Sequence, residues 1–189
     1  MSHTDFTVAA LEWKPYVPPI VLDNATPAQR DALRVTPSNT KVSDYVLVLA
    51  HDAEALSERT PLFNGIMYAA GGLSRAEREL GALAASVVNR CVYCASVHAR
   101  RYNELTKTTA VVDEIYAREK SAKLDARQQA VFDYSVKLSE CPSAADGGDI
   151  ERLRAVGLND LQILDLTHST AIFGWANRLM HTLGEPIDP

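Results

Sequence analysis

The sequence GGLSRAERELGALAASVVNRCVYCASVHARR, residues 71–101, contains the start signals of two consecutive helices. Ser74 and Glu77 have the spacing of a capping box, in which two side chains satisfy the free amides at a helix start. Leucine, alanine and valine residues then recur at helical spacing as far as Val88. A second helix is expected to begin near Cys91, which puts the CxxC motif at the start of a core helix.

Cys91, Cys94 and His98 carry the chemistry of this stretch. At 100° per residue their side chains share one face of the expected helix, so they can touch. A thiol pair at this spacing can close a disulfide, a helix start stabilises a thiolate, and an imidazole one turn along can accept a thiol proton. Cys94 is therefore the candidate nucleophile, and Cys91 the candidate that closes the disulfide. Two simpler interpretations stay open: two buried thiols packed like small apolar residues, and a zinc site, which the lack of a second CxxC disfavours.

The rest of the chain also favours an all-α fold. Capping residues, prolines and glycines mark further helices, and the sequence contains neither an alternating strand pattern of useful length nor a glycine-rich phosphate loop. We therefore expect a multi-helical bundle of about seven or eight helices. The further helices are expected at residues 27–33, ended by Pro37, and at 43–56, 61–70, 109–118, 125–139, 149–155 and 160–183.

Length and composition predict one domain. A chain of 189 residues with 47% hydrophobic content is long enough for one well-filled core. We expect this single domain over residues 1–189, with an extended N-terminal arm at 1–25 and the helical core at 41–185. Three prolines in WKPYVPPIVL, residues 13–22, hold that arm extended, so it could reach a neighbouring subunit.

Charge, cysteine count and hydropathy limit the partners and the compartment. A net charge of −5 without a run of lysines or arginines argues against nucleic acid and anionic membranes as partners. No apolar stretch approaches the roughly 20 residues of a membrane-spanning helix. Three cysteines without a secretory signal at the N-terminus favour a reducing cytoplasm over an extracellular disulfide scaffold.

One spacing in the chain resembles that of a known family. Glu79, followed after eleven residues by Cys91-x-x-Cys94-x-x-x-His98, is similar to the motif of the alkylhydroperoxidase AhpD-like proteins of the carboxymuconolactone decarboxylase superfamily. The ending FGWANRLMHTLGEP is similar to that of the peroxidase-related branch. The resemblance implies the AhpD-like helical bundle. It also implies, position by position, that Cys94 attacks the peroxide, that Cys91 closes the disulfide, and that Glu79 and His98 form a proton relay.

Two features qualify what the resemblance implies. Tyr93 stands where better-studied members can carry a histidine before the second cysteine, so proton transfer by that histidine is absent or altered. The decarboxylases that give the superfamily its name lack the CxxC pair, whose presence here argues against their reaction. The choice of Glu79 over Glu77 rests on the family spacing, since a helical wheel puts Glu77 closer to the apolar stripe.

We therefore expect a thiol-dependent peroxidase that requires no cofactor and no metal. A small hydroperoxide would oxidise Cys94 to a sulfenic acid, Cys91 would form the Cys91–Cys94 disulfide, and an external dithiol or a thioredoxin-like or lipoyl reductant would reset the pair. The apolar helices of family members also imply a homo-oligomer. Two alternatives remain: a thiol–disulfide oxidoreductase or redox sensor acting on protein partners, and a non-catalytic helical assembly module in which the dithiol joins two helices.

Overall fold

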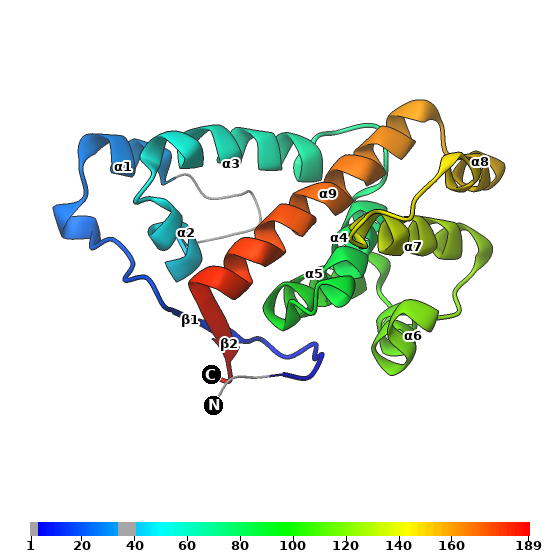
Figure 1. Cartoon of the computed structure of the whole chain (residues 1–189), viewed down its shortest axis with the longest axis horizontal. Helices are drawn as coiled ribbons and strands as arrows, with labels where there is room; N and C mark the ends of the chain where they lie inside the picture. The colour runs from blue at the N-terminus through cyan, green and yellow to red at the C-terminus, as the bar shows by residue number, and fades with distance from the viewer. Residues whose placement is uncertain (1–3, 34–40) are drawn as a thin grey trace.

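A computed structural model describes residues 4–33 and 41–189 of the chain. In these ranges the fold is all-α, as expected, with nine α-helices, one more than the upper expected number, and one two-stranded sheet (Figure 1). None of the described helices combines the length and apolarity that crossing a membrane requires. The α-helices are α1 Pro27–Ala32, α2 Asp44–Leu49, α3 Ala53–Tyr68, α4 Arg75–Val88, α5 Val92–Thr106, α6 Ala110–Arg118, α7 Ala126–Ser139, α8 Gly147–Ala155 and α9 Asp160–Leu183. The strands are β1 Glu12–Pro15 and β2 Gly184–Ile187, and two 3-10 turns lie at Leu22–Asn24 and Glu119–Ser121.

Helix α4 lies at the centre of the fold. It packs against α5, α7 and α9, and every residue from 78 to 87 is buried. Gly81 permits this close packing, because a Cβ there would lie 2.8 Å from Thr170 Oγ1 and 2.9 Å from Leu166 Cδ1 on α9. Figure 1 shows α9 crossing the middle of the molecule, with α1–α3 on one side and α6–α8 on the other.

The expected start signals of the helices are present in the structure. The Glu77 amide donates to Ser74 Oγ over 3.2 Å, and the Ser74 amide donates to Glu77 Oε2 over 3.3 Å, which completes the capping box of α4. The same reciprocal pattern begins α1 at Thr26 and α9 at Asn159. These local hydrogen bonds explain why the sequence located these starts well.

Two expected helices were divided at the wrong place. The pattern predicted helices at 43–56 and 61–70, whereas the structure has the short α2 followed by the longer α3. Asp52 causes the break, because its carboxylate accepts a hydrogen bond from the Ala55 amide at 3.0 Å and caps a new helix. Pro61 lies inside α3 rather than at a helix start. It is exposed, so water can satisfy the carbonyl that its missing N–H leaves free.

Helix α8 also begins earlier than expected. Asp146 is its N-cap and Asp149 occupies the third helical position, so α8 starts at Gly147 rather than at Asp149. Gly157 follows the end of this helix as expected, with φ of +88°, a conformation that favours glycine. Pro37, the expected end of the first helix, lies outside the described residues.

The N-terminal segment pairs with the C-terminal end of the same chain. No strand of useful length was expected, yet β1 and β2 form an antiparallel pair with Trp13 opposite Pro186. Strands of four residues are too short to show a clear alternating pattern. Trp13 Nε1 donates to the Met180 carbonyl at 3.2 Å, and its ring meets Tyr45 edge-on with centroids 5.6 Å apart. Strand β1 therefore packs beside the apolar cluster that contains both cysteines of the CxxC motif.

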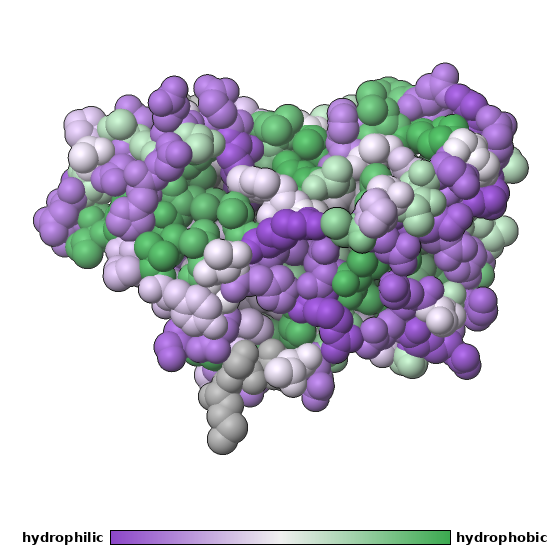
Figure 2. All heavy atoms as spheres, in the orientation of Figure 1, coloured by the Kyte–Doolittle hydropathy of each residue, from purple (hydrophilic) through white to green (hydrophobic). Residues whose placement is uncertain are grey.

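Apolar side chains remain uncovered near the N-terminal helices. In Figure 2 they gather over the part of the surface that α1 and α2 occupy in Figure 1. The exposed apolar residues of this region include Val17, Val21, Leu22 and, on α3, Leu62. Exposed apolar patches are typical of contact surfaces, and the expected homo-oligomer stays a prediction.

Candidate active site

The turn between α4 and α5 positions the CxxC motif. Arg90 adopts φ of +56°, and the Cys91 amide donates to the Ser86 carbonyl at 2.8 Å, so the chain reverses within three residues. Cys91 is then the N-cap residue of α5 and Cys94 lies in its first turn, where the sequence placed them. Both thiols are free and nearly covered, with exposed fractions of 3% for Cys91 and 7% for Cys94.

His98 lies one turn beyond Cys94 and contacts two buried partners. Its Nδ1 is 2.5 Å from Oε2 of Glu79, a carboxylate of α4 with no exposed surface. Its ring meets Phe173 of α9 edge-on, with centroids 4.0 Å apart. Arg75 donates to the other oxygen of Glu79 through Nε and Nη2. The helical hairpin thus joins Glu79 and His98, the two residues that the family spacing paired.

The charge of Glu79 decides how His98 is protonated. Burial alone raises the pKa of Glu79, but the adjacent His98 and Arg75 lower it more, so its pKa lies below the usual value. An ionised carboxylate only accepts hydrogen bonds, so Nδ1 of His98 donates to Glu79. In neutral His98 the other nitrogen, Nε2, then carries no proton and can act as a base.

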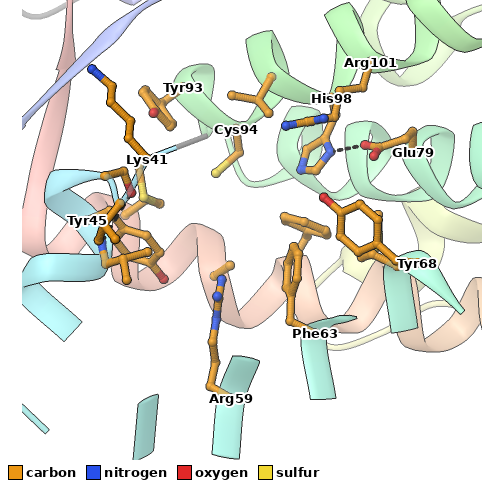
Figure 3. Close-up of a pocket in the computed structure, with 18 of the residues that line it drawn as sticks. Lys41, Tyr45, Arg59, Phe63, Tyr68, Glu79, Tyr93, Cys94, His98 and Arg101 are labelled. Carbon is orange, nitrogen blue, oxygen red and sulfur yellow. Dashed lines mark hydrogen bonds and ion pairs between the residues drawn. The ribbon is translucent and has the colours of Figure 1, made fainter. Parts of the chain in front are cut away.

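A cavity of about 390 Å³ opens beside Cys94. Figure 3 shows His98 between Cys94 and Glu79 on one side of this cavity, with Tyr45 and Arg59 on the other side. The walls come from α4, α5 and α9 and from the segment of α2 and α3. Aromatic and basic side chains are prominent in the lining, which includes Lys41, Tyr45, Arg59, Phe63, Tyr68, Arg75, Tyr93, Arg101 and Phe173.

The two thiols differ in pKa although they share one helix turn. A hydrogen bond with the Cys94 thiol, supported by the Cys94 amide and Asn177, lowers the pKa of Cys91 against the opposing effect of burial. The neighbouring Cys91 and burial raise the pKa of Cys94 well above its usual value. The helix start thus favours the ionised form of Cys91 over that of Cys94, while Cys94 borders the cavity.

The four candidate residues gather at this site, and the structure adds others. Three of them line the cavity, and Cys91 lies behind Cys94. Sequence reasoning missed Tyr45 and Arg59, because α2 and α3 reach the site through tertiary packing and carry no motif of their own. It also missed the contact of Asn177 with the thiols. Within residues 4–33 and 41–189, no three His, Cys, Asp or Glu side chains cluster as metal ligands.

Comparison with known proteins relates this site to a family. Residues 53–135 match the carboxymuconolactone decarboxylase family, and this range holds all four candidate residues. Among curated proteins, none matches the chain in sequence.

Two crystal structures are similar in both fold and sequence. One is described as alkylhydroperoxidase AhpD core, an uncharacterized peroxidase-related protein from Ralstonia eutropha JMP134, with 27% identity, a TM-score of 0.75 and coverage of 90% of each chain. The other is an uncharacterized peroxidase-related protein from Silicibacter sp. TM1040, with 25% identity, a TM-score of 0.74 and coverage of 92% of this chain and 93% of that one.

A third structure shows that the fold does not fix the reaction. The apo form of the debrominase Bmp8 has a TM-score of 0.76 over 92% of each chain, but at 18% identity this likeness concerns the fold alone. The family match over the dithiol and the likeness to the two peroxidase-related structures support an AhpD-like protein of the carboxymuconolactone decarboxylase superfamily.

Proposed function

We propose that this chain is a thiol-dependent peroxidase that reduces small hydroperoxides. One observation carries the proposal: Cys94 borders a cavity of small-molecule size, with His98 beside it and Cys91 behind it. The likeness to peroxidase-related proteins supports the same class of reaction.

The first step oxidises Cys94. Nε2 of His98 accepts the thiol proton, and the resulting thiolate attacks the outer oxygen of the hydroperoxide R–O–OH, whose O–O bond breaks. The products are a sulfenic acid on Cys94 and R–O⁻, which takes the proton from His98 and leaves as an alcohol. Glu79 orients the imidazole and stabilises its cation while it carries the proton.

The second step joins the two cysteines, and a third step resets them. The Cys91 thiolate attacks the sulfur of the Cys94 sulfenic acid, and the departing hydroxide is protonated to water. The lowered pKa of Cys91 favours this step, because it makes the attacking thiolate easier to form. An external dithiol, either thioredoxin-like or lipoyl, then reduces the disulfide by two exchange steps and is itself oxidised to a disulfide.

The limited exposure of the dithiol favours a small substrate over a protein partner. Exposed fractions of 3% and 7% leave little sulfur surface for a folded protein that carries a disulfide. A small hydroperoxide can reach Cys94 through the cavity. A dithiol that only joined two helices would require neither the cavity nor the buried His98–Glu79 pair.

Peroxide titration of single cysteine variants tests the proposal. Reduced protein is mixed with one equivalent of cumene hydroperoxide, and the products are mapped by mass spectrometry. We expect one Cys91–Cys94 disulfide per hydroperoxide consumed, no consumption by Cys94→Ser, and a trappable sulfenic acid in Cys91→Ser. Cys141→Ser is the matched control, because Cys141 is exposed and lies outside this cavity. Undiminished consumption by Cys94→Ser would contradict the assignment.

A further inference from the structure

Two polar groups on the α2–α3 side of the cavity have no acceptor. Nε of Arg59 and the hydroxyl of Tyr45 are covered from solvent, and neither has a hydrogen-bond partner among the described residues. Both side chains line the cavity, and Figure 3 shows them on the same side of it, across from His98. A buried donor without an acceptor costs free energy. In this conformation both donors are covered, so a ligand in the cavity could supply the missing acceptor after a small rotation of the two side chains towards it.

Arg59 also has no carboxylate partner. None of the ion pairs within residues 4–33 and 41–189 includes it. Its guanidinium lies over the Phe63 ring, with Cζ 4.5 Å from the centroid. Burial lowers the pKa of Arg59, yet an arginine stays protonated at neutral pH. A largely buried cation without a counter-ion is typical of a site that receives an anion.

Neither Glu79 nor the Cys94 thiol supplies a counter-ion for Arg59. Arg75 also lines the cavity, but its charge is balanced by Glu79. The Cys94 thiol is not the missing anion either, because its pKa is raised well above the usual value. Arg59 thus has no counter-ion among the charged groups that serve the dithiol, while Tyr45 packs in the same buried cluster as the two cysteines.

We propose that the cavity binds hydroperoxides that carry a carboxylate on an aromatic body. Arg59 and the Tyr45 hydroxyl hold the carboxylate, and the peroxide group faces Cys94. This inference rests on the proposed function and names its substrate class. A carboxylate matches these donors, since its two oxygens accept hydrogen bonds from a guanidinium and from a hydroxyl at the same time.

The walls of the cavity fit an aromatic body between these two ends. Phe63 and Phe173 line it and meet edge-on, with centroids 5.7 Å apart, and Tyr68 and Tyr93 add two further rings. Aromatic side chains favour flat, apolar ligands. The volume of about 390 Å³ lies within the range of small-molecule sites.

A matched pair of hydroperoxides tests the role of the carboxylate. The probes are cumene hydroperoxide with a para carboxylate and the methyl ester of the same compound, which has the same ring and peroxide without the charge. Stopped-flow kinetics should show that the acid oxidises the wild-type dithiol about 10- to 100-fold faster than the ester. Arg59→Gln should remove this preference by slowing the acid far more than the ester, whereas Arg59→Lys should restore part of it.

Two further variants separate the role of Arg59 from general damage. Tyr45→Phe should reduce the preference for the acid by a smaller factor, because it removes one neutral donor. Arg154→Gln is the control, since Arg154 lies on α8 and pairs with Glu151 and Asp160 outside the cavity. If the ratio of the acid and ester oxidation rates is the same in wild type and Arg59→Gln, the carboxylate site is overturned. If both probes are nevertheless turned over, the peroxidase assignment stays intact.

A binding measurement tests the site without relying on turnover. Isothermal titration with 4-isopropylbenzoate, which has no peroxide group, should show binding to the wild type and at least about tenfold weaker binding to Arg59→Gln. The neutral 4-isopropylbenzamide should bind the two proteins alike. Equal affinity of the benzoate for both proteins, or no binding to the wild type, would overturn the inference. If neither hydroperoxide oxidises the dithiol but benzoate binding still depends on Arg59, the peroxidase assignment is refuted and the anion site is retained.

Discussion

Two buried carboxylates of this molecule have similar partners but different surroundings. Glu79 on α4 and Asp149 on α8 have side-chain exposed fractions of 0% and 2%. Each is bound by two basic residues, Glu79 by Arg75 and His98, and Asp149 by Lys137 and Arg152. On burial and ion pairing alone, the two positions would therefore be equally good candidates for a catalytic carboxylate.

The difference lies in the partner and in the space beside it. Glu79 lines the cavity, and its partner His98 has a second ring nitrogen that can act as a base. Asp149 does not line that cavity, and it also accepts a hydrogen bond from the Asp146 amide at the start of α8. A buried carboxylate indicates a reaction site when a titratable partner and a cavity accompany it, and otherwise indicates a structural contact.

Glu79→Gln is expected to separate the two carboxylates most strongly. Glutamine keeps the shape but removes the charge that orients His98 and stabilises its cation, so the rate of Cys94 oxidation should fall about 10²- to 10⁴-fold. Single-turnover stopped-flow kinetics with excess hydroperoxide measures this rate. Asp149→Asn is the matched change and should leave the rate unchanged. Equal rates for Glu79→Gln and the wild type would mean that neither carboxylate serves the reaction.

Asp149→Asn is expected to act on stability instead. Burial raises the pKa of Asp149, but hydrogen bonds from Lys137, the Asp146 amide and Arg152 lower it to about 2, below its usual 3.8. Because the folded pKa is depressed, the ionised side chain stabilises the fold above about pH 4, and this contribution is lost as the pH falls towards 2. At pH 7 the substitution should lower the free energy of unfolding by roughly 1–2 kcal/mol, since both basic partners are partly exposed and screened.

Urea unfolding across pH 2 to 7 checks this expectation. The difference in the free energy of unfolding between wild type and Asp149→Asn should shrink as the pH falls below about 4. Asp160→Asn is a control of the same chemistry, because Asp160 pairs with Arg154 at an exposed fraction of 85% and should change stability little. If Asp149→Asn lowers the free energy of unfolding by the same amount at every pH, the substitution acts through the helix cap rather than through the charge.

The sequence predicted the residues on one side of the cavity better than those on the other side. Cys91, Cys94 and His98 lie on one helix, so their spacing alone brings them together, and the family spacing then supplied Glu79 from the preceding helix. The opposite wall depends on how α2 and α3 pack, and no local pattern identifies Arg59 there. Contacts within a helix follow from periodicity, whereas contacts between distant segments follow from the assembled core.

The boundaries of the elements show the same limit. N-cap residues located α1, α4 and α9, since Thr26, Ser74 and Asn159 each accept a local hydrogen bond at a helix start. The break before α3 depends on Asp52 acting as an N-cap in the middle of a continuous apolar pattern. The pairing of β1 with β2 joins the two ends of the chain, so neither strand shows its partner in its own sequence.

The smallest effects on rate and stability are expected when the arginine partner of each carboxylate is substituted. Arg75→Gln leaves the His98–Glu79 pair in place, so the oxidation rate should fall only about three- to tenfold. Arg75 contributes to the lowered pKa of Glu79; without it that pKa rises, and the acid limb of the pH–rate profile should move to higher pH. Arg152→Gln removes a side chain that is 57% exposed, so it should change the stability little and leave the pH–rate profile unmoved. If the acid limb stays in place in Arg75→Gln, ionisation of Glu79 does not limit the reaction, and His98 alone distinguishes the two clusters.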